Sequence, residues 1–156
     1  MTGKHIVVTG AGTGIGRAIA LRLGRGGAAV TLLARDGDRL ETVAAAMEAP
    51  THVAACDIRD RGKVEKAFAG AVAELGPVHA LVACSGVGGS NGGDAKSDRF
   101  DEIVATNLNG TYYCCRSTLD HLAPGPEPRH LVVLSSILAR IPVPMDSSRR
   151  GAAVRR

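Results

Sequence analysis

The sequence predicts an α/β fold, in the form of a doubly wound parallel sheet with helices on both faces. Short runs of apolar, often β-branched residues alternate with longer segments in which apolar residues recur at helical spacing, which is the pattern of βαβ units. Aromatic residues are scarce, with no Trp, two Phe and two Tyr, so small aliphatic side chains must fill the core. A chain of 156 residues is long enough to bury such a core as one domain.

Five short apolar runs are the expected strands, because each is bounded by Gly, Pro or polar residues. They lie at residues 5–9, 30–34, 52–56, 78–84 and 130–134. Helices must join them as right-handed crossovers, since parallel neighbours cannot be joined by tight turns. The expected strand order in this Rossmann-type sheet is 3-2-1-4-5.

Four segments between the strands carry apolar residues at the spacing of amphipathic helices. These helices are expected at residues 15–25, 36–49, 60–75 and 100–123. Asp36 is the expected N-cap of the second helix, and Pro50 marks its end. Five glycines within residues 85–94 indicate a surface loop before the last helix.

The formal net charge of +4 comes from the end of the chain, where Arg149, Arg150, Arg155 and Arg156 carry four positive charges. Residues 1–148 are therefore neutral overall. A neutral body without a basic stripe argues against nucleic acid as the partner. Nucleic-acid binding through the arginine tail alone would show itself as an affinity that falls steeply with salt.

Cys56, Cys84, Cys114 and Cys115 show neither the C-x-x-C spacing nor the neighbouring His cluster of a metal site. We expect them to be inert thiols in a reducing cytosol. The same absence of ligand spacing means that no metal is expected. No apolar run approaches the roughly 18 residues of a membrane span, so no membrane partner is expected. The sequence therefore predicts a cytoplasmic protein.

A glycine-rich turn, residues 9–16, follows the first expected strand immediately. It reads Thr-Gly-Ala-Gly-Thr-Gly-Ile-Gly. Glycines at this position let backbone N–H groups approach a pyrophosphate, which then lies at the positive end of the following helix. Their spacing differs from the Gly-x-Gly-x-x-Gly fingerprint and fits the variant Thr-Gly-x-x-x-Gly-Ile-Gly.

This variant resembles the short-chain dehydrogenase/reductase family, and the resemblance continues through Asp57-Ile58, Asn107-Leu108-Asn109-Gly110 and Ser135-Ser136. It implies a dinucleotide-binding Rossmann-type domain over residues 1–148, followed by a basic tail without family pattern at residues 149–156. It also implies an oxidoreductase that transfers hydride between a nicotinamide cofactor and a carbonyl/alcohol pair. By the same resemblance, the cofactor phosphates are held by Gly10, Thr13, Gly14, Ile15 and Gly16.

The residues at the end of the second strand are expected to determine whether NAD(H) or NADP(H) binds. An acidic residue there would accept a hydrogen bond from the ribose 2′-OH, whereas an Arg pairs with a 2′-phosphate. This chain has Ala34 followed by Arg35, so NADP(H) is expected in preference to NAD(H). Asp36 and Asp38 nearby weaken this interpretation, and a solvated surface role for Arg35 stays open.

Two further positions follow the third and fourth strands. The resemblance places Asp57 on the adenine amine, with the Ile58 backbone beside it; alternatively, Asp57 caps the next helix. After the fourth strand the family has Asn-Asn-Ala-Gly, whereas residues 83–86 read Ala-Cys-Ser-Gly. Gly86 still permits a close approach to the ribose, but the Asn side chains that tie the sheet together there are absent.

The resemblance also implies which residues take part in the reaction. Asn107 matches the Asn that supports the proton relay, and Ser136 matches the Ser that holds the substrate oxygen. The family's base is the Tyr of a Tyr-x-x-x-Lys motif. The resemblance places this Tyr at position 149 and the Lys at position 153, where the chain has Arg149 and Ala153 instead. We therefore expect the chain to bind cofactor far better than it turns substrate over. The alternative is a non-catalytic nucleotide-binding or interaction module.

The end of the chain departs from the family pattern in two further ways. The only tyrosines, Tyr112 and Tyr113, are expected to be core aromatics of the last helix rather than catalytic groups. The pattern stops after Met145 and the family's last strands have no counterpart, which indicates a C-terminally truncated or frameshifted member. The fifth strand would then be an uncovered edge without charge or Pro, so self-association is expected.

Overall fold

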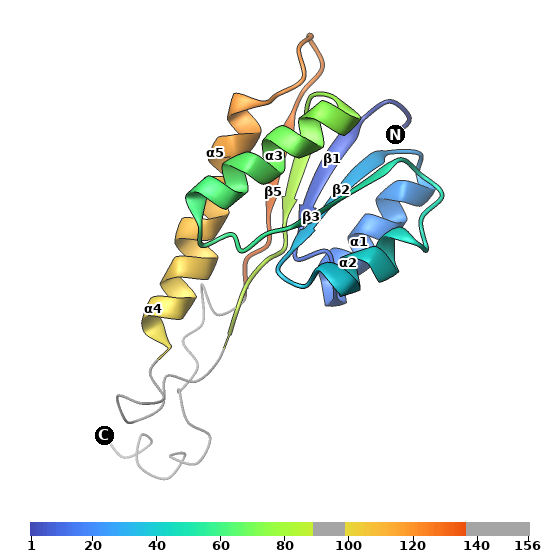
Figure 1. The fold of residues 1–156 in the computed structure, drawn as a ribbon. Helices are drawn as coiled ribbons and strands as arrows, with labels where there is room; N and C mark the ends of the chain where they lie inside the picture. The colour runs from blue at the N-terminus through green and yellow to red at the C-terminus, as the bar shows by residue number, and fades with distance from the viewer. Residues whose placement is uncertain (89–98, 137–156) are drawn as a thin grey trace, which may run out of the picture.

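The computed structural model describes residues 1–88 and 99–136 (Figure 1). The rest of the predicted glycine-rich loop and the basic tail, with positions 149 and 153, lie outside the described residues. In chain order the elements are β1 (His5–Thr9), α1 (Gly14–Arg25), β2 (Ala29–Ala34), α2 (Gly37–Ala44), β3 (Thr51–Ala55), α3 (Arg61–Leu75), β4 (Ala80–Ala83), α4 (Phe100–Ile103), the π-helix η1 (Val104–Gly110), α5 (Thr111–Asp120) and β5 (His130–Val133).

The strands form one parallel sheet in the order β3-β2-β1-β4-β5, which confirms the predicted order. β1 lies in the centre, where Ile6 pairs in register with Val30 of β2 and with Ala80 of β4. The strand order reverses beside β1, because the chain runs outward to β3 and then returns to β4. In open α/β sheets, ligands bind at the carboxyl ends of the strands that flank such a reversal.

The side chains of β1 alternate between two hydrophobic cores, one on each face of the sheet. Ile6 and Val8 belong to the core shared with α1 and α2, whereas Val7 belongs to the core shared with α3 and α5. Phe68 of α3, which is 1% exposed, fills the centre of the second core. Figure 1 shows the two helix layers on opposite sides of the sheet, which is how a parallel sheet with apolar faces is covered.

Two aspartates start helices in this structure. Asp36 caps α2, since its Oδ1 accepts a hydrogen bond from the Arg39 N–H at 3.1 Å, as predicted. Asp60 caps α3 in the same way, accepting from the Lys63 N–H at 3.1 Å. Because Asp60 fills this position, the alternative that Asp57 caps the helix is wrong.

α2 is shorter than predicted. It ends at Ala44, although the sequence places no proline before Pro50. Beyond α2 the backbone tightens into i→i−3 hydrogen bonds, such as the one from the Met47 N–H to the Ala44 oxygen at 2.9 Å. The tighter turn packs Met47 on α1, where its Cε would lie only 2.5 Å from a Cβ atom at Gly24. Met47 thus packs against α1 in the segment that follows the end of α2.

The last helical segment contains a π-helical turn that the sequence analysis did not foresee. Thr106 and Gly110 are the buried residues of η1, and a Cβ atom at Gly110 would lie 2.6 Å from Ile58 Cγ1. Such π-turns are rare and often occur at functional sites. Tyr112, two residues after η1, is 58% exposed, so the expectation that it is a core aromatic is wrong, whereas Tyr113 packs against the core.

β5 forms one edge of the described sheet. Within the described residues it pairs only with β4, and Leu131, Val132 and Val133 are 42%, 48% and 51% exposed. The N–H groups of His130 and Leu134 donate to carbonyl oxygens on the β4 side. Because these directions alternate along a strand, the N–H groups of Leu131 and Val133 point to the open edge.

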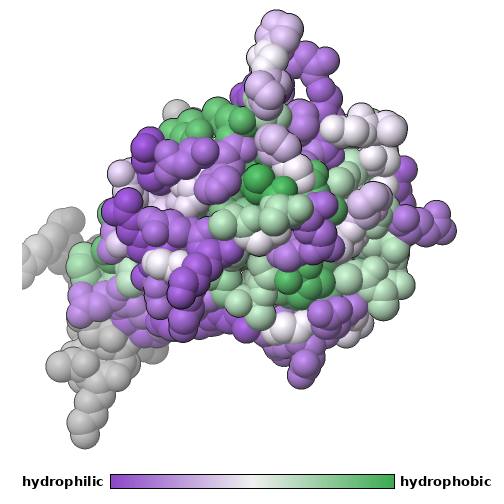
Figure 2. Space-filling model, turned by 45° about the horizontal axis from the view of Figure 1, so that its top comes forward, coloured by the Kyte–Doolittle hydropathy of each residue, from purple (hydrophilic) through white to green (hydrophobic). Residues whose placement is uncertain are grey.

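Figure 2 shows hydrophobic residues gathered in small patches between hydrophilic side chains on the face in view. Within residues 1–88 and 99–136, no helix combines the length and the apolar character needed to cross a membrane.

Candidate functional site

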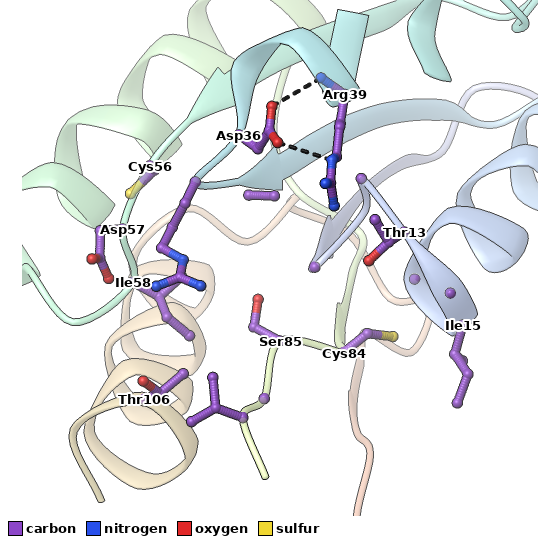
Figure 3. A pocket seen from close by; sticks show the side chains of 18 of the residues that line it. Thr13, Ile15, Asp36, Arg39, Cys56, Asp57, Ile58, Cys84, Ser85 and Thr106 are labelled. Carbon is purple, nitrogen blue, oxygen red and sulfur yellow. Dashed lines mark hydrogen bonds and ion pairs between the residues drawn. The ribbon is translucent and has the colours of Figure 1, made fainter. Parts of the chain in front are cut away.

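A cavity of about 500 Å³ lies at the carboxyl ends of the strands that flank the reversal of strand order. Its wall combines the glycine-rich turn after β1, the start of α2, and the segments that follow β3 and β4 (Figure 3). Every residue that was predicted to bind the cofactor lines this cavity, namely Gly10, Thr13, Gly14, Ile15, Gly16, Arg35, Asp57, Ile58 and Gly86.

The glycine-rich turn depends on two close approaches between backbones. Gly10 has a φ of +67°, and a Cβ atom on it would lie 3.0 Å from the backbone nitrogen of Ser85 after β4. A Cβ atom on Gly16 would lie 2.3 Å from the Gly10 carbonyl oxygen, closer than any real contact. Glycine at these positions brings the first turn of α1 directly against the end of β1.

The amino end of α1 carries an uncompensated positive end of the helix dipole. Thr13 is the N-cap residue, but its side chain makes no capping hydrogen bond, and the first turn contains no acidic residue. Ile15 in this turn is 63% exposed and lines the cavity. Free backbone N–H groups at the start of a helix form an anion site, so this part of the cavity suits a phosphate group.

Two arginines lie on the cavity wall beyond β2. Arg35 directly follows the strand, and Arg39 lies in the first turn of α2, where its Nε is 2.9 Å from Asp36 Oδ2. Ala34 ends the strand without a carboxylate. The sequence analysis missed Arg39; the available signal was its place three residues after the predicted N-cap Asp36, which puts it in the first turn of the helix.

Asp57 follows β3 and is among the residues that line the cavity. The Arg59 Nε donates to its Oδ1 at 3.0 Å, and the Arg59 backbone N–H donates to the same oxygen at 3.0 Å. The side-chain hydrogen bond from Arg59 holds the pKa of Asp57 below its ordinary value, and Arg35 adds a weaker attraction. Asp57 is therefore an ionised hydrogen-bond acceptor at neutral pH. Ile58 beside it is 4% exposed and packs in the core.

Two cysteines on the cavity wall are poor nucleophiles. Burial raises the pKa of Cys56 to about 11 and also raises the pKa of Cys84. Little thiolate exists at neutral pH in either case, and the thiolate is the reactive form. Both are free cysteines, as are Cys114 and Cys115. This agrees with the expectation of inert thiols.

Thr9, at the end of β1, ties the strand to the segment that follows β4. Its Oγ1 accepts hydrogen bonds from the N–H groups of Cys84 at 3.1 Å and Ser85 at 3.0 Å. These bonds hold the segment where the family's Asn side chains are absent. The sequence analysis did not single out Thr9, although it opens the glycine-rich turn.

Asn107, on η1, holds the same segment from the other side. Its Oδ1 accepts from the Val87 N–H at 2.8 Å, and its Nδ2 donates to the Val87 carbonyl oxygen at 2.8 Å. Gly86 lies alongside, since a Cβ atom on it would be 3.5 Å from Asn107 Oδ1. Asn107 itself is not part of the cavity wall, but its neighbour Thr106 is. Asn107 therefore positions the segment that lines the cavity.

Residues 4–148 match the family described as short chain dehydrogenase. The chain belongs to this family. It is 34% identical over 119 residues to a 2-dehydro-3-deoxy-L-rhamnonate dehydrogenase (NAD(+)) of a Sphingomonas species, and the match covers 75% of this chain and 47% of that protein. The chain spans about half the length of the curated relatives it matches.

Two solved structures are similar to this chain. A dehydrogenase/reductase from Sinorhizobium meliloti superimposes with a TM-score of 0.82 at 31% identity, covering 92% of this chain and 58% of that one. An alcohol dehydrogenase from Thermococcus sibiricus, in complex with 5-hydroxy-NADP, gives a TM-score of 0.69 at 31% identity, covering 76% and 52%. Membership of the family implies a nicotinamide dinucleotide cofactor and a small-molecule substrate. It does not decide between NAD and NADP.

Ser136 lies close to the cavity without lining it. Leu134, two residues earlier, is on the cavity wall, and Ser136 itself is exposed. The structure therefore gathers all predicted cofactor residues at one cavity, and it places the two predicted catalytic residues, Asn107 and Ser136, beside it.

Proposed function

We propose that this chain binds NADP(H) in preference to NAD(H), and that its reaction type is hydride transfer on a carbonyl/alcohol pair. The observation that carries the proposal is the cavity at the strand reversal, because it combines an open helix start with two arginines. The helix start would hold the pyrophosphate and Asp57 the adenine amine. The bound cofactor supplies the hydride; the residues of the chain bind and orient it.

The preference for NADP(H) rests on the residues after β2. Ala34 offers no carboxylate to the ribose 2′-OH of NAD(H), while Arg35 offers a guanidinium to a 2′-phosphate. Each charge-assisted hydrogen bond contributes about 1.5–3 kcal/mol. The nearby carboxylates of Asp36 and Asp57 are each paired with an arginine, so their repulsion of a phosphate is partly compensated.

We expect NADPH to bind at least about tenfold more tightly than NADH, and Arg35→Gln to remove most of this difference by weakening NADPH alone. Titration calorimetry with both cofactors measures it. Arg61→Gln is the matched control, because Arg61 is an exposed arginine on α3 that is ion-paired to Glu65. Comparable wild-type affinities for NADPH and NADH would contradict the proposal.

The second candidate function is a non-catalytic nucleotide-binding module. It is favoured by one observation, the presence of Arg149 and Ala153 at the positions where the family has its Tyr and Lys. In the first candidate, Ser136 would hold the substrate oxygen, and Asn107 would keep the cavity wall in place. Turnover separates the two candidates, whereas cofactor binding does not. The four free cysteines support the predicted cytoplasmic location.

We also propose that a second copy of this chain pairs with the open edge of β5. Among the strands of residues 1–88 and 99–136, none pairs with the outward N–H groups of Leu131 and Val133, and β5 contains no Asp, Glu, Lys, Arg or Pro to prevent pairing. Two identical strands can pair antiparallel about a twofold axis, which closes the contact with a dimer.

Light scattering should then report about twice the mass of the monomer for the wild-type chain. Val132→Lys should give the monomer mass, because a buried pair of ammonium groups would repel at the contact. Val132→Thr retains the β-branched shape without a charge and should remain dimeric. A wild-type monomer would refute this contact.

A further inference from the structure

All five histidines of the chain lie at the amino end of the sheet, away from the cavity. His5 and His130 are the first residues of β1 and β5, His52 is the second residue of β3, and His79 directly precedes β4. His121 follows α5, and its carbonyl oxygen accepts a backbone hydrogen bond from the segment before β4. Figure 1 shows this end of the sheet beside the N-terminus. The proposed function uses none of these side chains.

The imidazole of His79 accepts a hydrogen bond from the backbone of β1. The His5 N–H donates to His79 Nδ1 at 3.1 Å. A ring nitrogen accepts only when it carries no proton, so this bond requires the neutral ring with its proton on Nε2. In the other direction, the His79 backbone N–H donates to the His5 carbonyl oxygen at 2.8 Å. The His79 ring thus adds one bond between β1 and the start of β4, and this bond exists only while the ring is neutral.

His5 is buried, and both nitrogens of its ring have partners. The residue is 2% exposed. Its Nδ1 lies 2.6 Å from the Gly76 carbonyl oxygen, which can only accept, so Nδ1 carries the proton. Its Nε2 lies 2.8 Å from Thr31 Oγ1 and accepts from that hydroxyl when the ring is neutral. The ring therefore joins β1 to β2 and to the turn after α3, and its tautomer is the opposite of that of His79.

The surroundings of His79 oppose its protonation. Burial lowers the pKa of His79, and the charges of Arg129 and Lys4 lower it further. The Glu127 carboxylate is ion-paired with Lys4, so it offsets part of that cation's charge. From β5, His130 reaches His79 through the backbone, since its N–H donates to the His79 carbonyl oxygen at 3.3 Å. A proton on His79 Nδ1 would therefore face two cations and would also remove the bond to β1.

The surroundings of His5 act in the same direction. Burial lowers the pKa of His5, the Gly76 carbonyl opposes this shift in part, and the charges of His79 and His52 lower the pKa further. The Glu74 carboxylate of α3 is engaged elsewhere, because its Oε2 lies 2.5 Å from His52 Nδ1. Within residues 1–88 and 99–136, no carboxylate bonds to the ring of His5 or of His79. Both rings therefore lack the partner that would stabilise their charged form.

We infer that the amino end of the sheet is a pH-sensitive switch, in which the neutral rings of His5 and His79 join β1, β2 and the turn between α3 and β4, and protonation of His79 breaks this junction. A proton on His79 Nδ1 would face the His5 N–H, so an attraction between donor and acceptor becomes a repulsion between two donors. Residues 76–79 then lose a bond to β1. This inference goes beyond the proposed function and does not depend on cofactor binding.

The direction of the pH dependence follows from the lowered pKa values of both histidines. Below the ordinary histidine pKa of about 6.5, the unfolded chain takes up protons that the folded chain does not. The fold therefore loses stability as the pH falls from about 6.5 toward the lowered pKa values, and these two groups cause no loss above that range. Each histidine that stays neutral in the fold raises the equilibrium constant for unfolding by up to about tenfold per pH unit.

Urea unfolding at pH 7 and at pH 5 tests the switch on the wild-type chain, on His79→Asn and on His130→Asn. The amide oxygen of Asn can accept from the His5 N–H in place of Nδ1 and does not titrate, so His79→Asn retains the bond without the proton site. Between pH 7 and pH 5, we expect the equilibrium constant for unfolding to rise about tenfold more in the wild type than in His79→Asn. His130→Asn changes an exposed histidine of the same end of the sheet and should retain the pH dependence of the wild type.

Nitrogen-15 NMR of the imidazole rings in the wild-type chain supplies a second measurement, which decides the matter even if His79→Asn does not fold. At pH 7 we expect neutral rings, with the proton on Nε2 in His79 and on Nδ1 in His5, and a midpoint below about pH 6.5 for the titration of His79. A proton on Nδ1 of His79 at pH 7, or a midpoint at or above 6.5, would overturn the inference. Equal losses of stability on acidification in the wild type and in His79→Asn would overturn it as well.

Discussion

Replacing Gly16 with alanine is expected to abolish cofactor binding and to destabilise the fold. The new Cβ atom would lie 2.3 Å from the Gly10 carbonyl oxygen and 3.1 Å from the Thr9 oxygen. Both are backbone atoms at the end of β1 and cannot turn aside, so α1 must move away from the turn. We expect a loss of about 3 kcal/mol in the free energy of unfolding, or about 6–12 °C in Tm. Displacing two N–H groups from the phosphates would weaken NADPH binding about 100-fold or more.

Gly62→Ala is the matched control for this change. Gly62 also lies in the first turn of a helix, α3, but a Cβ atom on it meets only Asp60 Oδ1 at 3.6 Å, an ordinary contact. Alanine favours the helix there, so we expect a gain of about 0.5–1 kcal/mol and unchanged cofactor affinity. Thermal unfolding and NADPH titration measure both variants. A Gly16→Ala variant as stable as the wild type would show that the described backbone approach is not required.

The local features of this fold are those that the sequence predicts best. The cap by Asp36 and the apolar runs of the strands depend on neighbouring residues alone, and both are confirmed. The family resemblance also led to nine predicted cofactor residues, and the structure brings all nine to the wall of one cavity. The end of α2 at Ala44 was missed, because the sequence offers no Gly or Pro there, and the tightened turn that follows it packs Met47 near Gly24, which is distant in the sequence.

Two parts of the site required the structure because they join elements that are distant in the chain. Arg39 becomes a cavity residue only when the first turn of α2 is oriented by its cap over the glycine-rich turn. Asn107 reaches Val87 from η1, whose π-helical turn leaves no sign in the spacing of apolar residues. The family resemblance alone does not show that the Asn107 side-chain amide binds the backbone of Val87.

The 156-residue chain is expected to bind NADPH and to reduce carbonyl compounds at least about 10²-fold more slowly than the median enzyme, whose kcat is about 10 s⁻¹. Hydride delivery to a carbonyl carbon leaves an oxyanion that needs a proton. The positions where the family has its Tyr and Lys hold Arg149 and Ala153, and a guanidinium stays protonated at ordinary pH. The thiols on the cavity wall are weak acids, because burial raises the pKa of Cys56 and of Cys84, so we expect only slow proton transfer from them.

NADPH consumption in the presence of a panel of aldehydes and ketones measures this turnover, with the Gly16→Ala variant as the blank because it should not retain the cofactor. Rates at the level of the blank, together with tight NADPH binding, would favour the non-catalytic module. Turnover near 10 s⁻¹ would contradict the prediction. Its loss in Ser136→Ala would then place the reaction at this cavity and require a proton donor other than the family's Tyr, since binding alone supplies orientation but no proton.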